Sequence, residues 1–296
     1  MPIVHEFEYL KPGSIEEAVR LLKARGVAAR VLAGGTDVVS ELRDGLIAPD
    51  LLIDIKGIAG LDTIASDDGM LTIGPLVTFT DLIDSSVVRH EFPVLWEAAR
   101  SVGSTGIRNR ATMVGNICSA VPCCDAGPPL LVYEAAVQVA GRDGPRSIPI
   151  ADWFLGPRKT ALRSGEIVTS VHVSRPADGH GGAYVKLGRY KGEDLAQASV
   201  AVLALRGDRY RVAFGAVAPR PVRAPRIESL MEGRVLDDAV IEGAKRLVPE
   251  ETAPITDVRA SEEYRAHMLP VMFERGARAA VGRLAGEGPA YGTRLV

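Results

Sequence analysis

Two glycine-bearing segments carry the clearest chemical signal in this sequence. The first is Ala33-Gly34-Gly35-Thr36-Asp37, and the second, Thr112-Met113-Val114-Gly115-Asn116, follows after a long interval. A pyrophosphate needs backbone N–H groups that point at it and side chains small enough to allow close approach. One such segment is weak evidence, because an isolated glycine pair is as often a simple turn between a strand and a helix. Two in similar apolar surroundings predict the two halves of a dinucleotide cradle.

Short polar side chains strengthen this prediction. Thr36, Thr112, Asn116 and Ser119 place hydroxyl or amide groups beside the glycines, where each can hydrogen-bond to phosphate. Asp37 stands where a helix is expected to begin, and we interpret it mainly as the N-cap of that helix rather than as a functional acid. No residue set predicts a catalytic acid, base or nucleophile.

Other nucleotide and metal chemistries lack their motifs. The sequence has neither the G-x-G-x-x-G fingerprint after its first strand nor a G-x4-G-K-[ST] loop, and it contains neither H-E-x-x-H nor G-x-S-x-G. Cys118, Cys123 and Cys124 form a C-x4-C-C group, which does not match the spacing of zinc or common iron–sulfur sites. We expect free thiols in a reducing compartment and no metal site.

Composition excludes several classes of partner. The chain of 296 residues is 47% apolar and 24% charged, with a net charge of -2, which is typical of a globular protein and gives no general attraction to nucleic acid. No apolar run is long enough to span a membrane, and the first residues do not resemble a secretory signal. A cytoplasmic location is expected.

The order of elements predicts an α+β fold in three parts. Residues 1–57 are expected to form a small α/β unit, with a helix that begins after a capping box at Ser14 and ends at Gly26. Residues 58–176 are expected to form a second α/β unit, and 175–182 a linker. Residues 183–286 are expected to form an antiparallel sheet covered by helices. The predicted elements are strands at 29–33, 51–55, 71–74, 136–140, 167–173, 183–187, 199–205 and 210–217, and helices at 38–43, 80–83, 93–99, 125–134, 237–248 and 261–284.

Six motifs together resemble a known family. They are Val31–Asp37, Leu71–Phe79 and Ile107–Ile117 in the first two parts, and Tyr184–Arg189, Phe214–Arg223 and Asp257–Arg265 in the third. Their types and order resemble the FAD-binding medium subunit of the xanthine dehydrogenase and carbon monoxide dehydrogenase family of molybdenum hydroxylases. The resemblance implies an FAD-binding fold of two α/β subdomains, like that of vanillyl-alcohol oxidase, followed by a C-terminal flavoprotein domain.

The resemblance also implies which residues bind FAD. The expected cofactor-binding residues are Leu32, Ala33, Gly34, Gly35, Thr36, Asp37 and Val38 in the first segment, Ala111, Thr112, Gly115 and Asn116 in the second, and Ser119, Asp125, Leu162 and Lys186 elsewhere. Leu162 would contact the flavin through its backbone and Lys186 would lie near the isoalloxazine. Val114 departs from the family's usual Gly-Gly, and because a β-branched residue disfavours positive φ, we expect this segment to reach the phosphates through Gly115 and its neighbours.

The family implies a place in an electron relay. Electrons would come from a molybdopterin-binding large subunit through [2Fe-2S] clusters on a small subunit, reduce FAD on this chain, and leave to NAD, a quinone or another external acceptor. The assembly would be a dimer of heterotrimers. Two alternatives stay open: a stand-alone flavoenzyme, such as the reductases of cell-wall precursor synthesis, and a non-catalytic assembly subunit with an empty cradle.

Overall fold

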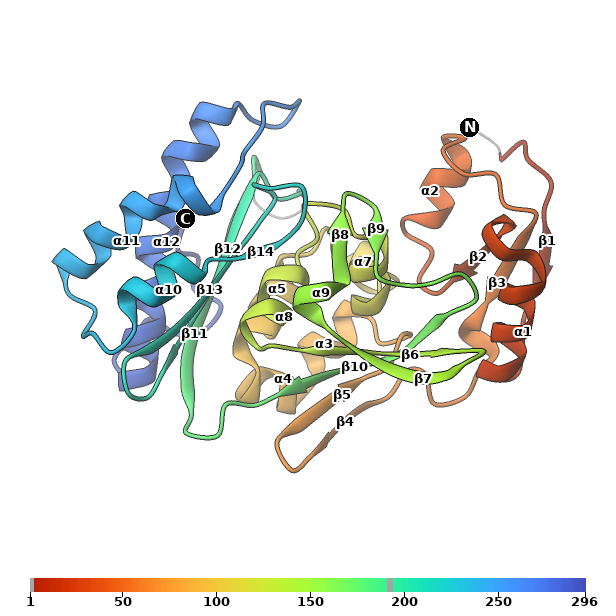
Figure 1. Ribbon diagram of the computed structural model, residues 1–296, viewed down its shortest axis with the longest axis horizontal. Coiled ribbons are helices and arrows are strands. Elements are labelled where there is room, and N and C mark those ends of the chain that lie inside the picture. The colour runs from red at the N-terminus through yellow and green to blue at the C-terminus, as the bar shows by residue number, and fades with distance from the viewer. Residues whose placement is uncertain (1–2, 191–193) are drawn as a thin grey trace.

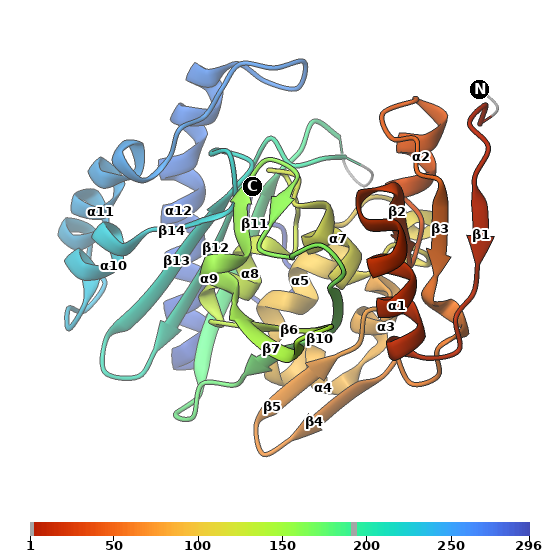
Figure 2. The same ribbon diagram turned by 45° about the vertical axis from the view of Figure 1, so that its right-hand side comes forward.

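The computed structural model describes residues 3–190 and 194–296, and its elements form three units side by side (Figure 1). The N-terminal unit has a parallel sheet in the order β1 (Glu8–Leu10), β3 (Leu51–Asp54) and β2 (Ala29–Leu32). Its helices are α1 (Ile15–Arg25) and α2 (Val38–Arg43), with 3-10 turns η1 (Gly26–Ala28) and η2 (Ile55–Gly57). Figure 2 shows this unit at one end of the molecule.

Helix α1 forms as the sequence predicts. The Ser14 hydroxyl accepts a hydrogen bond from the Glu17 amide at 3.2 Å, and the helix ends where Gly26 adopts a φ of 55°, a backbone conformation that glycine adopts at little cost. Ala18 and Leu22, four residues apart, face the buried side chains of β3, as the helical repeat requires. The capping residue and the apolar spacing therefore suffice to place this helix.

The central unit holds an antiparallel sheet in the order β4 (Ile64–Asp67), β5 (Met70–Ile73), β10 (Ile167–Ser174), β6 (Ala136–Gly141) and β7 (Gly144–Pro149). The edge strands β4 and β7 escape sequence prediction because most of their side chains are exposed, which leaves no apolar alternation to detect. The other elements of the unit are α3 (Phe79–Asp84), α4 (Ser86–Glu91), α5 (Pro93–Ser101), α6 (Thr105–Arg108), α7 (Met113–Ser119), α8 (Gly127–Val132), α9 (Ile150–Trp153), β8 (Phe154–Gly156) and β9 (Lys159–Thr160).

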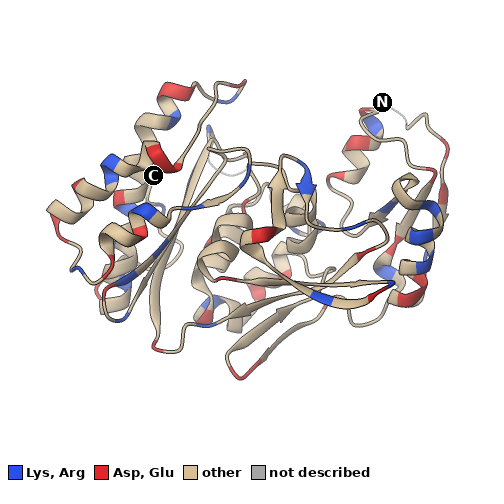
Figure 3. Ribbon diagram, viewed as in Figure 1, with Lys and Arg blue, Asp and Glu red and all other residues tan. Residues whose placement is uncertain are grey.

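The C-terminal unit is an antiparallel sheet of β11 (His180–Leu187), β12 (Ala198–Leu205), β13 (Arg209–Gly215) and β14 (Val222–Arg223). Helices α10 (Pro225–Met231), α11 (Asp238–Glu251) and α12 (Glu262–Ala285) cover one face, and α5 and α8 of the central unit pack on the other (Figure 1). All of β12 is buried because its side chains alternate between the two cores. Charged residues of both signs are interspersed along the ribbon of all three units (Figure 3).

Strand β11 begins earlier than predicted. The expected linker runs to residue 182, but the strand starts at His180. A Cβ atom at Gly181 would lie 2.1 Å from the carbonyl oxygen of Ala280 on α12. These glycines therefore permit close packing between the sheet and a helix, whereas their usual meaning in a sequence is a flexible connection.

A partly buried histidine, His180, joins the central and C-terminal units. The Tyr133 hydroxyl lies 2.9 Å from His180 Nε2, and the two rings meet edge to face with centroids 5.4 Å apart. Burial, together with the nearby charges of Arg175 and Arg211, lowers the pKa of His180 to about 4. The imidazole is therefore neutral in the folded protein at pH values where it is protonated in the unfolded chain.

Acidification should destabilise the fold through this residue. Below the unfolded pKa the unfolded chain binds a proton that the folded protein does not, so the free energy of unfolding falls by about 2 kcal/mol between about pH 7 and about pH 5. Urea denaturation at both pH values measures this loss. A His180→Gln variant has no imidazole to protonate, so its free energy of unfolding should fall by about 2 kcal/mol less than that of the parent over the same pH range. An equal fall in both proteins would contradict the assignment of this pH dependence to His180.

Candidate cofactor site

The first glycine segment is the turn between β2 and α2, and it touches the second segment directly. A Cβ atom at Gly34 would lie 1.9 Å from the carbonyl oxygen of Arg110 and 3.2 Å from Cα of Ala111. Gly35 adopts a φ of +83°, which strongly favours glycine. The structure thus brings together two segments from different units, and only a residue without a side chain fits at their contact.

The backbone amides of the first segment are free to bind a ligand. Within the described part of the chain, the N–H groups of residues 34–37 donate to no protein acceptor. Successive unpaired amides in a glycine turn form the kind of concave donor surface that binds phosphate oxygens. The structure therefore supplies the free backbone N–H groups that the predicted pyrophosphate site requires.

An ion pair between Lys56 and the buried Asp54 holds the first segment in place. Lys56 Nζ donates to the Ala33 carbonyl at 3.1 Å and lies 2.7 Å from Asp54, which is 2% exposed at the end of β3. The Tyr9 hydroxyl also donates to Asp54. Burial by itself would raise the pKa of Asp54, but hydrogen bonds from Lys56 and Tyr9 outweigh it and lower that pKa. The ionised carboxylate thus holds the lysine that fixes the turn.

The second segment is the first turn of a helix, which is absent from the predicted helices. Helix α7 begins at Met113, and the Thr112 side chain caps it by accepting the Gly115 amide at 3.0 Å. Val114 is 3% exposed in the helix and has no positive φ. The expected difficulty at Val114 therefore disappears, because a helical backbone suits a β-branched residue that packs in the core.

A side-chain hydrogen bond also joins the first segment to helix α7. Ser119, at the end of α7, donates its hydroxyl to Asp37, and Arg158 pairs with Glu41 of α2 close by. Asp37 stands at the N-cap position of α2, as expected, but its side chain does not cap the helix: its backbone is helical, at φ -90° and ψ -51°, and its carboxylate makes no capping bond. A capping side chain needs an extended backbone to reach the first amides of its helix, so this carboxylate extends to Ser119 instead.

Asp125 and Lys186 meet at the junction with the C-terminal unit. Their side chains are 2.8 Å apart and nearly buried, and Lys186 Nζ also donates to the Ser101 carbonyl at 2.8 Å. Tyr184 donates its hydroxyl to Asp125 at 2.8 Å. Burial raises the pKa of Asp125 although Lys186 opposes the shift. Tyr184 is not among the residues expected to bind the cofactor; its signal in the sequence is its position two residues before Lys186, on the same face of β11.

The remaining predicted residues lie around these contacts. Leu32 ends β2, Val38 begins α2, and the Thr36 carbonyl accepts from Ser40. Ala111 precedes the cap of α7, and its carbonyl accepts the Phe79 amide. Asn116 accepts the Ala126 amide at 3.1 Å, which ties α7 to the segment that carries Asp125. Leu162 follows β9 and is partly buried against the core, and within the described residues no hydrogen bond joins it to the glycine segments.

The three cysteines are free thiols, of which Cys123 and Cys124 are buried and Cys118 is partly buried. Cys123 is 9% exposed and Cys124 is 1% exposed. Burial raises the pKa of Cys118 to about 12 and also raises the pKa of the other two. The thiols are therefore protonated at neutral pH, a state that neither attacks a substrate nor ligates a metal readily.

Comparison with protein families decides the assignment. The sequence model described as "FAD binding domain in molybdopterin dehydrogenase" matches residues 5–176, and "CO dehydrogenase flavoprotein C-terminal domain" matches residues 183–280. The chain belongs to this family. It is an FAD-binding subunit of the xanthine dehydrogenase and CO dehydrogenase type, and the resemblance inferred from the motifs is confirmed.

Individual relatives align over nearly their whole length. The xanthine dehydrogenase FAD-binding subunit of Escherichia coli O157:H7 is 32% identical, over 94% of this chain and 97% of that protein. The carbon monoxide dehydrogenase medium chain of Afipia carboxidovorans is 31% identical, again over 94% and 97%. A solved structure of carbon monoxide dehydrogenase from Hydrogenophaga pseudoflava superimposes with a TM-score of 0.92 at 32% identity, over 96% of this chain and 100% of that one. The predicted α+β fold and the oxidoreductase class are thereby confirmed.

The family's cofactor fits the observed site. FAD carries a pyrophosphate, and the free amides of residues 34–37 at the contact with Ala111 match that group in chemistry.

Over residues 3–190 and 194–296, no helix combines the length and apolar character needed to cross a bilayer.

Gly34→Ala should abolish this cradle. The added Cβ would overlap the Arg110 carbonyl, so the two segments must separate, and we expect FAD affinity to fall at least about 100-fold, or about 2.7 kcal/mol. Titration with FAD, followed by quenching of flavin fluorescence, measures the loss. Gly106→Ala is the matched control, because a Cβ there meets nothing closer than 3.9 Å; similar affinities in the two variants would contradict the proposed cradle.

Proposed function

We propose that this chain holds FAD between its N-terminal and central units, receives electrons from the [2Fe-2S] clusters of a partner subunit, and passes them to an external acceptor. The observation that carries the proposal is the close contact of Gly34 with Arg110, beside a row of unpaired backbone amides. The residues assigned to the cofactor are the fifteen expected from the sequence, among which the amides of residues 34–37 would bind the pyrophosphate.

The chain's own residues bind and orient the cofactor. FAD, when bound, supplies the reversible electron chemistry, and the protein supplies position and electrostatics. Thr36 and Thr112 flank the phosphate-binding turn, and the contact between Asp37 and Ser119 fixes the separation of the two units. Lys186 brings a buried positive charge, held by Asp125 and Ser101, to the side of the isoalloxazine. No general acid or base is required for this role.

The remaining assignments are proposals. Proteins named as medium chains and FAD-binding subunits align with 94% of this chain, which supports assembly with a molybdopterin-binding large subunit and a [2Fe-2S] small subunit; we propose a dimer of heterotrimers in the cytoplasm. The acceptor is NAD, a quinone or another small molecule. We assign residues 1–57 and 58–176 as the two FAD-binding subdomains and 183–286 as the C-terminal flavoprotein domain.

The relay is tested in the purified complex with the Gly34→Ala chain in place of the parent. Because the partner's clusters are untouched, a dye in its one-electron-reduced form should still donate electrons to them, as electron paramagnetic resonance reports. Transfer onward to NAD or a quinone should be lost, since FAD is missing. Turnover of an external substrate by the isolated FAD-loaded chain would instead indicate a stand-alone flavoenzyme and would overturn the relay.

Asp125→Asn should raise the midpoint potential of the bound flavin. The amide keeps an acceptor for Tyr184 but leaves the charge of Lys186 uncompensated, and a positive charge favours the reduced, more negative cofactor. The expected rise is about 30 mV, or about 1.4 kcal/mol for a two-electron couple. Anaerobic redox titration followed by visible absorbance measures it. Glu228→Gln removes a comparable carboxylate, 2.7 Å from Arg223 but away from the site, and should leave the potential unchanged.

A further inference from the structure

The chain turns back on itself after α12, and the turn is built for close packing. Gly286 adopts a φ of +80°, and the Glu287 amide donates to the Gly282 carbonyl at 2.8 Å. A Cβ atom at Gly288 would lie 2.4 Å from the Arg283 amide nitrogen. The returning residues, 286–296, lie beyond residues 183–280, which the C-terminal family model matches.

A buried ion pair holds this returning segment. Glu97 of α5 and Arg283 of α12 lie 2.9 Å apart with side chains 5% and 3% exposed. Arg283 also donates to the carbonyls of Pro289 at 2.9 Å and Ala290 at 3.1 Å. Glu97 accepts the Gly292 amide at 2.8 Å. The pair therefore links a helix of the central unit, a helix of the C-terminal unit and the returning segment in one network.

Tyr291 and Gly292 of the returning segment make specific contacts with both neighbouring units. Tyr291 accepts the Gly182 amide at 3.3 Å, and its ring lies 4.2 Å from the Arg283 guanidinium. Gly292 has a φ of +87°, and a Cβ atom there would lie 2.1 Å from Arg100 Nη1. Arg100 in turn stacks on the Trp96 ring at 4.6 Å. The positive φ strongly favours glycine at position 292, and a Cβ atom there would displace the Arg100 guanidinium and lie 3.2 Å from the Trp96 ring.

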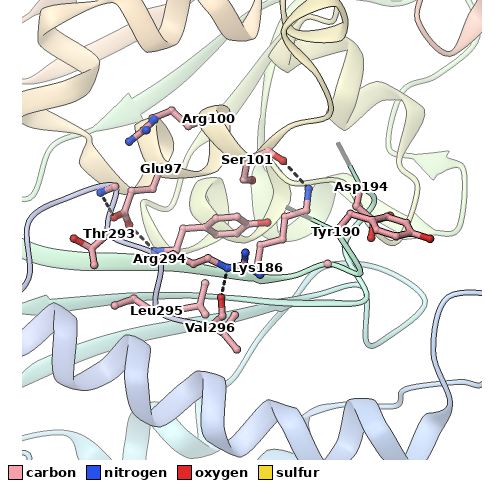
Figure 4. Close-up of a pocket in the computed structure, with 14 residues that line it drawn as sticks. Glu97, Arg100, Ser101, Lys186, Tyr190, Asp194, Thr293, Arg294, Leu295 and Val296 are labelled. Atoms are coloured by element: carbon pink, nitrogen blue, oxygen red, sulfur yellow. Dashed lines mark hydrogen bonds between the residues drawn. The ribbon is translucent and has the colours of Figure 1, made fainter. Parts of the chain in front are cut away.

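The network reaches the residues proposed to lie beside the flavin. The second oxygen of Glu97 accepts the Tyr184 backbone amide at 2.9 Å, and the side chain of Tyr184 bonds to Asp125, the partner of Lys186. Residues 292–296 also form one wall of a cavity of about 380 Å³ that Ser101, Tyr190 and Lys186 line from the other side (Figure 4). Residues 292–296 and Lys186 thus line the same cavity.

We propose that residues 286–296 are a clasp that fixes the C-terminal sheet against the central unit and so positions Tyr184 and Lys186 for the flavin. Glu97 is the central positioning residue, because it binds the clasp, α12 and the Tyr184 backbone at once. This inference rests on the proposed function, in which Lys186 lies beside the isoalloxazine. The clasp acts through position alone, and no bond is made or broken.

Gly292→Ala is the direct test, and Gly233→Ala is its matched control. Both replace a glycine of positive φ, but a Cβ at Gly233 meets nothing within 4 Å whereas one at Gly292 meets Arg100. In the intact complex, Gly292→Ala should shift the midpoint potential of the flavin, weaken FAD binding several-fold and expose residues 286–296 to limited proteolysis. Gly233→Ala should share none of these effects.

A milder variant keeps the test decisive if Gly292→Ala fails to fold. Tyr291→Phe removes only the hydroxyl that accepts the Gly182 amide and should move the same three measurements in the same directions by smaller amounts. If either folded variant loses thermal stability while its flavin potential and visible spectrum stay those of the parent, the segment merely stabilises the fold and the proposal is overturned.

The outcomes also distinguish a failure of the clasp proposal from a failure of the proposed function on which it rests. If the parent complex binds no FAD, the proposed function itself fails. If the parent binds FAD and Asp125→Asn shifts the potential, but Gly292→Ala and Tyr291→Phe do not, the flavin site stands and the clasp alone is refuted.

Discussion

The contact between Gly34 and the Arg110 carbonyl is the constraint on which the proposed site depends. It joins a turn of the N-terminal unit to the entry of α7 in the central unit, at a distance that no side chain permits. The other contacts between these units act around it: Asp37 with Ser119, and Glu41 with Arg158. Lys56 and Asp54 hold the same turn from within its own unit. Close approach of backbones thus leaves the amides of residues 34–37 beside the junction, where a phosphate can reach them.

Two buried ion pairs play the corresponding part at the junction with the C-terminal unit. Asp125–Lys186 and Glu97–Arg283 each join the central unit to the C-terminal unit. Burying charges costs solvation, and a buried pair is weak evidence of added stability, but losing one partner leaves an uncompensated charge and is strongly unfavourable. Such pairs therefore penalise wrong arrangements of the two units. Tyr184 connects them through its amide and its hydroxyl, so the orientation of the C-terminal sheet and the environment of Lys186 are set together.

Local signals in the sequence were sufficient where local physics decides the structure. The Ser14 cap and apolar spacing predicted α1, and the glycine turn at Gly34 was predicted between β2 and α2. Prediction failed where distant contacts decide. The glycines before Ala183 were interpreted as a linker because their close packing on α12 is not visible in the sequence, and the Asp37 carboxylate bonds to a residue of another unit. The error at α7 was local: Thr112 followed by Met113, Val114 and Ile117 is a helix start that the adjacent glycine obscured.

The central claim is that both glycine segments enclose one FAD, and hydrogen–deuterium exchange of the chain with and without FAD tests it most directly. The amides of residues 34–37 have no protein acceptor in the described structure and should exchange rapidly without the cofactor. On adding FAD we expect protection of these amides together with residues 111–116, in proportion to occupancy. Protection confined to one segment, or none in either at saturating FAD, would contradict the account.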